Sequence, residues 1–153
     1  MSNFSVAAVV AAMGLILAAA PAASASELLI SKDEAARPAI ADMGAFGTRG
    51  LTRGPRIEQV SPDPHSAGAK SPFPLEIHFS AHNDTTVDPS SVQVTYLKSP
   101  SVDLTPRLKG HITASGIDLG DADVPPGTHM IRIDVVDSQG RKGTSIIKLS
   151  VLP

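Results

Sequence analysis

Cysteine and tryptophan are missing from the 153 residues, and aromatic side chains make up only 3% of the chain. Without cysteine, neither a disulfide-stapled fold nor a thiol nucleophile is available. One Tyr and four Phe leave few rings on which nucleic-acid bases could stack. The formal charge of −2 gives no excess of basic residues either. The composition therefore excludes a disulfide-rich domain and argues against a nucleic-acid partner.

The motifs of the common catalytic sites are missing as well. The chain has no GxSxG nucleophile elbow, no HExxH zinc motif and no glycine-rich phosphate loop. Paired carboxylates for glycoside hydrolysis would need a cleft, which a small bare sandwich seldom offers. We therefore predict that the protein is not an enzyme and uses no cofactor.

One long apolar run stands near the start of the chain. Residues Val6 to Ala20 read VAAVVAAMGLILAAA, and Pro21 and the tripeptide Ala23-Ser24-Ala25 follow. A short apolar core, a helix-breaking proline and an Ala-x-Ala site are typical of a secretory signal peptide. A membrane-spanning helix needs about 20 apolar residues, more than this run supplies. We predict a signal peptide over residues 1–25 that is cleaved after Ala25, and the alternative is an uncleaved membrane anchor.

That prediction places the protein in the periplasm or outside the cell. No segment after residue 25 is apolar enough to span a bilayer, so we expect no transmembrane segment in the mature chain.

Residues 26–56 show little periodicity. Ser31 and Glu34 have the spacing of a capping box that could start a short helix, and Pro38 would end that helix quickly. Four glycines follow in DMGAFGTRGLTRGPR, with no period of two or 3.6 residues. We predict a flexible, disordered N-terminal linker over residues 26–56.

From Ile57 onward the chain alternates between apolar and polar residues in short runs separated by turn residues. The clearest runs are 75–80, 92–96, 131–135 and 147–151, and Asp137 to Gly140 suits a type I turn between the last two. Residues 99–127 are less clear, with short strands expected around 102–104, 108–113 and 117–119. The pattern predicts an all-β fold over residues 57–153, a single antiparallel β-sandwich of about seven strands.

Three stretches of this region resemble the bacterial Ig-like domains of secreted and periplasmic proteins. They are IEQVSPDP, PFPLEIHFSAHNDTTVDPSSVQV and VPPGTHMIRIDVVDSQGRKGTSIIKLSV. The first two also look like the start of small periplasmic copper-binding sandwiches and of adhesin modules. The resemblance implies an Ig-like sandwich and a binding role. Copper-binding relatives typically begin the mature chain with a histidine ligand, whereas Ser26 stands at the predicted start here.

Two groups of side chains are candidate metal ligands. His78 and His82 lie near the end of one expected strand and could bind copper together with His65 or Met130. The acidic residues of the second group, expected on a loop, could supply oxygens for calcium; they are Asp118, Asp121 and Asp123. The alternative is that both groups are solvated surface residues. We expect His129 to be half buried at a strand end rather than a ligand.

The sequence thus leaves two hypotheses for function. The first is a non-catalytic secreted or periplasmic binding or structural module that recognises a protein or glycan partner of the cell envelope. Its candidate surfaces are the turn at 82–84 and the 118–123 segment. The second is a periplasmic metal-binding sandwich that holds copper or calcium.

Overall fold

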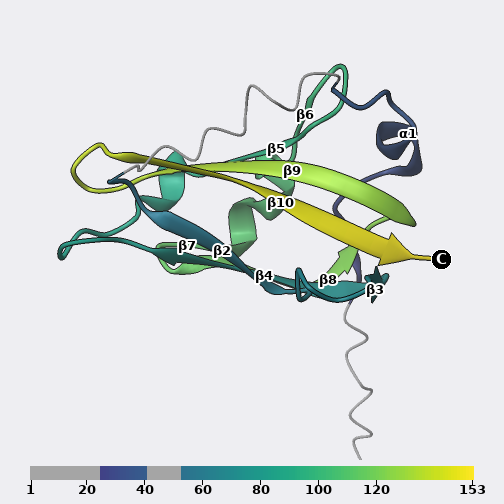
Figure 1. The fold of residues 1–153 in the computed structure, drawn as a ribbon, viewed down its shortest axis with the longest axis horizontal. Coiled ribbons are helices and arrows are strands. Elements are labelled where there is room, and N and C mark those ends of the chain that lie inside the picture. The colour runs from purple at the N-terminus through teal and green to yellow at the C-terminus, as the bar shows by residue number, and fades with distance from the viewer. Residues whose placement is uncertain (1–24, 41–52) are drawn as a thin grey trace, which may run out of the picture.

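The computed structural model describes residues 25–40 and 53–153 (Figure 1). All but the last residue of the predicted signal peptide, and residues 41–52 of the expected linker, lie outside the described residues. In the described ranges the chain forms two β-sheets that pack face to face, as the all-β prediction requires (Figure 1). No helix in these ranges is long and apolar enough to cross a membrane.

The first sheet has the strand order β1-β8-β4-β2, and β7 also pairs with β8. Strand β1 runs parallel to β8, and the other pairs in this sheet are antiparallel. The strands are β1 (Glu27–Leu28), β2 (Arg56–Ser61), β4 (Phe73–Ser80), β7 (Ile112–Thr113) and β8 (Gly116–Asp123).

The second sheet has the order β3-β10-β9-β5-β6, with β3 parallel to β10. Its strands are β3 (Ala69–Lys70), β5 (Gln93–Tyr96), β6 (Val102–Asp103), β9 (Gly127–Val136) and β10 (Lys142–Leu152). Both sheets are therefore mixed, whereas the sequence led us to expect antiparallel pairing throughout. In the described ranges, four short helical turns complete the fold: α1 (Lys32–Ala35), η2 (Pro89–Ser91), α2 (Thr105–Leu108) and η3 (Lys109–His111).

The hairpin of β9 and β10 confirms the clearest sequence pattern. Its register runs without a break from Lys142 opposite Val136 to Val151 opposite Gly127. The Gly140 N–H donates to the Asp137 carbonyl at 2.9 Å, which closes the expected turn. The apolar side of each strand is buried in the core, at residues 131, 133 and 135 of β9 and 147, 149 and 151 of β10.

The region between β5 and β9 differs from the prediction. Residues 108–113 were expected as a strand, but they contain the end of α2, then η3, and only the two residues of β7. Pro106 lies in the first turn of α2, where its missing N–H costs no helical hydrogen bond. Leu104 and Leu108 are one helical turn apart and both are buried, so this segment anchors itself with helical rather than strand spacing.

The 118–123 segment is another correction, because it belongs to strand β8 and not to a loop. Leu119 and Ala122 both face the core, three residues apart instead of two. The register against β4 shifts between these positions, since Leu119 lies opposite Leu75 and Ala122 opposite Phe73. This β-bulge interrupts the two-residue period, so the sequence indicated a strand only around 117–119 and not its continuation to Asp123.

The expected flexible linker is wrong for residues 26–40. Glu27 and Leu28 form β1, and Leu29 and Ile30 are 1% and 0% exposed within the core. The predicted capping box is confirmed: the Ser31 N–H donates to Glu34 Oε2 at 2.9 Å, and the Glu34 N–H donates to Ser31 Oγ at 3.2 Å. The sandwich therefore includes a segment well before residue 57. Burial of these two large aliphatic side chains offsets part of the conformational entropy that is lost when the segment is ordered.

Candidate binding edge on strand β10

The sides of the sandwich differ in how their sheet edges are protected. Edge strands β1 and β7 of the first sheet, and β6 of the second, are each only two residues long, and β2, at the other edge of the first sheet, has six residues. Short edge strands limit unwanted pairing. Strand β10, in contrast, has eleven residues, and on its outer side β3 pairs with it only at Val151 and Leu152. A long part of β10 therefore forms a sheet edge.

The direction of the main-chain groups along β10 follows from the neighbouring pairs. The Leu97 N–H donates to the Met130 carbonyl at 2.9 Å, so the main-chain groups of Met130 point toward β5. In an antiparallel ladder these groups alternate in direction, so those of Ile131 point toward β10 and meet Ile147. The groups that point away from β9, to the outer edge, are those of Thr144, Ile146 and Lys148.

These three residues form what we call the β10 window. Among the described residues, no hydrogen bond reaches their edge-facing N–H and C=O groups. The window is closed at one end by β3 and at the other by Gly54, where an added Cβ would lie 2.1 Å from the Lys142 carbonyl oxygen. Only glycine allows so close an approach, and it fixes the limit of the window.

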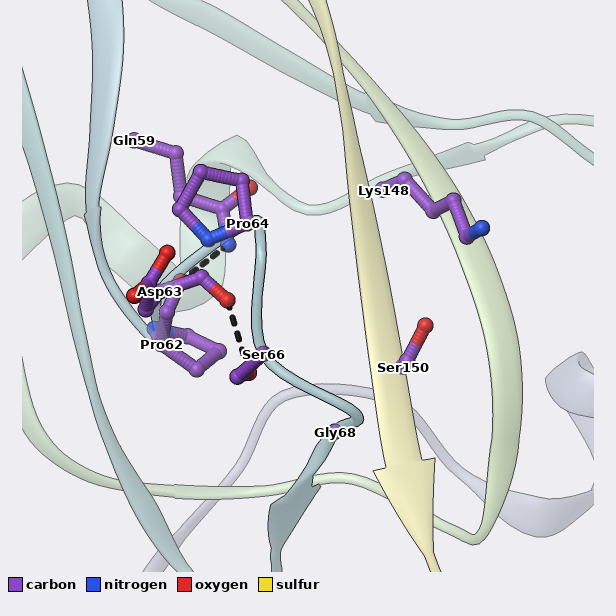
Figure 2. A pocket seen from close by; sticks show the side chains of 8 residues that line it. All are labelled: Gln59, Pro62, Asp63, Pro64, Ser66, Gly68, Lys148 and Ser150. Atoms are coloured by element: carbon purple, nitrogen blue, oxygen red, sulfur yellow. Dashed lines mark hydrogen bonds between the residues drawn. The ribbon is translucent and has the colours of Figure 1, made fainter.

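A polar pocket lies beside the window (Figure 2). One wall is formed by the end of β2 and the loop from β2 to β3. In this loop Ser66 Oγ donates to the Asp63 carbonyl at 2.7 Å, and Gln59 Nε2 of β2 donates to the Pro62 carbonyl. Figure 2 shows the side chains of Lys148 and Ser150 on the far side of β10 from this loop. The strand thus presents main chain rather than side chains to the pocket. The full lining is Gln59, Pro62, Asp63, Pro64, Ser66, Gly68, Lys148 and Ser150.

A buried carboxylate organises the side chains next to the window. Asp134 is 4% exposed and accepts a hydrogen bond from Thr144 Oγ1 at 2.6 Å. Its Oδ2 pairs with Arg132 at 2.8 Å, and its Oδ1 lies 3.3 Å from Lys142 Nζ. Burial alone would raise the pKa of Asp134, but the Thr144 hydrogen bond and the two cations outweigh burial and hold the pKa below its usual value. The ionised Asp134 therefore anchors Thr144 and Lys142 beside the edge.

This arrangement can bind an extended polypeptide through its main chain. Edge groups at alternate residues are about 6.7 Å apart, the spacing at which a neighbouring strand presents its own donors and acceptors. The apolar side chain of Val60, at a bulge of β2, is 49% exposed. Sequence reasoning missed the site because main-chain groups leave no residue motif.

The predicted metal ligands do not gather in one place. His78 lies on the outer face of the first sheet, opposite Glu58 and Gly116, whereas Met130 belongs to the second sheet. The acids lie along β8: Asp118 is opposite Glu76, Asp121 is partly exposed, and Asp123 Oδ1 accepts a hydrogen bond from Ser71 Oγ at 2.9 Å. Within the described ranges, no three His, Cys, Asp or Glu side chains are placed to share a metal ion.

The turn that carries His82 is held by a structural network. Asn83 and Asp84 have φ of 54° and 55°, and Thr85 Oγ1 donates to the His82 carbonyl at 2.7 Å. Thr85 also reaches Asp137, which is 3% exposed and accepts further hydrogen bonds from Arg141. Burial would raise the pKa of Asp137, but these hydrogen bonds and the Arg141 charge keep it low. The interpretation of Asp137 as a turn-forming residue is confirmed.

No protein-family model, curated protein or solved structure matches the chain.

Proposed function

We propose that the chain is a non-catalytic, secreted or periplasmic binding module that recognises an extended segment of a cell-envelope protein. The segment adds as a further strand to β10 at the β10 window. In strand addition of this kind, main-chain hydrogen bonds provide affinity and the side chains beside the edge provide selectivity.

The observation that carries the proposal is the run of edge-facing main-chain groups at Thr144, Ile146 and Lys148. These groups have no hydrogen-bond partner among the described residues. In the second sheet, β9 and β5 each have a neighbouring strand on both sides, so β10 is the long strand whose outer side is largely unpaired. Main-chain donors and acceptors are obligatory hydrogen-bonding groups, so such a row is a template for another chain. The main chain of an extended polypeptide presents donors and acceptors at the same spacing as this row, whereas a glycan does not. Of the two partner classes left open by the sequence, a protein and a glycan, this row of main-chain groups favours the protein.

The sheet orders support an Ig-like module. The order β2-β4-β8-β7 follows A-B-E-D of an immunoglobulin sandwich, and β10-β9-β5 follows G-F-C. Because this sandwich hosts many functions, the order says nothing about the partner. The extracytoplasmic location in the proposal comes from the predicted signal peptide, and the partner class comes from the β10 window.

The test is to remove one edge N–H without disturbing the hairpin. Ile146→Pro deletes an N–H that faces the window, so the β9–β10 ladder keeps its hydrogen bonds. Ile146→Val is the matched control, since it keeps the N–H and a similar side chain. Denaturant unfolding of both variants establishes that the hairpin remains folded.

Binding is then read by photo-crosslinking in the cells that produce the protein. A photoreactive residue in place of Lys148 should yield a covalent adduct with one envelope protein when it is combined with Ile146→Val, but not when it is combined with Ile146→Pro. The same photoreactive residue at position 78, on the other sheet, should yield none. An adduct that survives Ile146→Pro, or binding to a glycan array unaffected by that change, would overturn the proposal. An adduct with a second copy of the chain would overturn the envelope protein as partner.

A further inference from the structure

The segment from Glu27 to Pro38, which we call the N-terminal segment, closes the side of the sandwich opposite the β10 window. It starts in the first sheet, where Leu28 lies opposite Asp123 of β8. It ends beside the second sheet, at the connection between β5 and β6, where the Ser99 N–H donates to the Pro38 carbonyl at 2.9 Å. Between these ends, Leu29 and Ile30 belong to the common hydrophobic core. The segment thus bridges the two sheets as an inserted ligand would.

A charged clamp holds the middle of this segment. Arg107 donates to both carboxylate oxygens of Glu34, at 2.7 and 2.9 Å, and to the Leu29 carbonyl at 2.7 Å. A paired guanidinium and carboxylate of this kind is among the stronger hydrogen-bonded contacts. The Arg107 hydrogen bond is also the main reason why the pKa of Glu34 falls to about 2.

Two more contacts fix the ends of the segment. His111 Nε2 lies 2.9 Å from Glu27 Oε2, and Lys98 Nζ donates to the Ala35 carbonyl at 2.9 Å. All these partners lie at least 63 positions further along the chain. Apart from its own helix cap, the N-terminal segment is therefore held by contacts that do not depend on its covalent neighbours.

We propose that the groove occupied by the N-terminal segment also accepts this segment from a second copy, so that two copies associate by reciprocal exchange. Exchange remakes every contact named above, so it is a route to a dimer at low cost in free energy. Residues 39–52 connect the segment to Arg53 and can span at most about 50 Å when extended. The tether favours the intramolecular arrangement at low concentration, so exchange increases with protein concentration.

The absence of cysteine from the chain allows a direct test. One full chain carries Leu28→Cys and another carries Asp123→Cys. Because residues 28 and 123 are register partners, their Cα atoms are within disulfide range in a parallel pair. Mixing the two chains under mild oxidation should give a heterodimeric disulfide, since only exchange between copies brings the cysteines together. A mixture of Leu28→Cys with His78→Cys is the control for random collision.

A second test removes the intramolecular competitor. Glu34→Arg leaves two arginines facing each other within one chain, and Arg107→Glu leaves two glutamates. A mixture of these variants satisfies both clamps only by exchange, so native mass spectrometry should show a 1:1 dimer. The doubly reversed chain should stay monomeric at the same concentration. A mixture that stays monomeric, together with no disulfide above the control level, would overturn the proposal. Ile146→Pro should not alter exchange, so the exchange test is independent of the proposal that a partner binds at the β10 window.

Discussion

At the scale of single residues, the buried pair of Tyr96 and His129 shows how the core accommodates polar groups. His129 Nε2 lies 2.8 Å from the Pro125 carbonyl, which can only accept, so this nitrogen carries the proton. Nδ1 then accepts from the Tyr96 hydroxyl at 2.8 Å. The neutral imidazole is thus fully satisfied in one tautomer. The expectation of a half-buried His129 that is not a ligand underestimated its burial, because the residue is 2% exposed.

This pair predicts a pH dependence of stability. Burial and the nearby charge of Lys98 lower the pKa of His129, against the opposing effect of the Pro125 hydrogen bond. The unfolded chain therefore binds a proton below about pH 6.5 that the folded chain resists. The contribution of His129 to stability is present above that pH and is lost as the pH falls toward the lowered pKa. Urea unfolding between pH 7.5 and 5 should show this loss, and nitrogen chemical shifts should identify the Nε2–H tautomer.

Removing the partner hydroxyl tests the same arrangement. Tyr96→Phe leaves the buried Nδ1 without a donor, so we expect a loss of about 1–3 kcal/mol at pH 7.5. Nitrogen shifts of the other tautomer, or a free energy of unfolding equal to that of the wild type, would contradict the assignment.

At the scale of elements, sequence patterns succeeded where a strand is long and one face is buried. Strands β4, β5, β9 and β10 alternate along most of their length, so their inward residues could be named in advance. The pattern failed in the second half of β8, where a bulge adds one residue, and at α2, which is too short to show a period of 3.6. It also failed at β1, because Leu28, Leu29 and Ile30 are three apolar residues in a row with no alternation.

The packing of the N-terminal segment makes a quantitative prediction. Leu29→Ala or Ile30→Ala should each lower the free energy of unfolding by about 2–5 kcal/mol, because each removes a fully buried side chain and leaves a cavity. Leu28→Ala is the matched control, since Leu28 is 54% exposed, and its effect should stay within about 1 kcal/mol. Denaturant unfolding of the three variants measures the difference. Equal, small changes in the free energy of unfolding at all three positions would instead support the sequence-based prediction of a flexible linker.

At the scale of the whole molecule, the two sides of the sandwich differ in what covers them. The N-terminal segment fills one side with buried apolar residues and a charged clamp, whereas the β10 window leaves a sheet edge on the other. The sequence predicted the sandwich from side-chain periodicity, but both functional proposals depend on contacts between residues far apart in the chain. Neither the groove for residues 27–38 nor a row of main-chain groups has a local signature.

The arrangement of the candidate ligands over the whole molecule leads to a test between a binding module and a metal-binding protein. His78 and His82 do not join a third ligand among the described residues, and Asp118, Asp121 and Asp123 are spread along β8. We therefore expect thermal unfolding of the chelated chain from Ser26 to Pro153 to change by less than about 2 °C on adding Ca²⁺, Cu²⁺ or Zn²⁺. An ion at 100 times its dissociation constant would stabilise a folded protein by about 2.7 kcal/mol, or more than about 10 °C for a domain of this size. A shift that large with one ion, abolished by His78→Ala with His82→Ala or by Asp121→Ala, would make the metal hypothesis the better one.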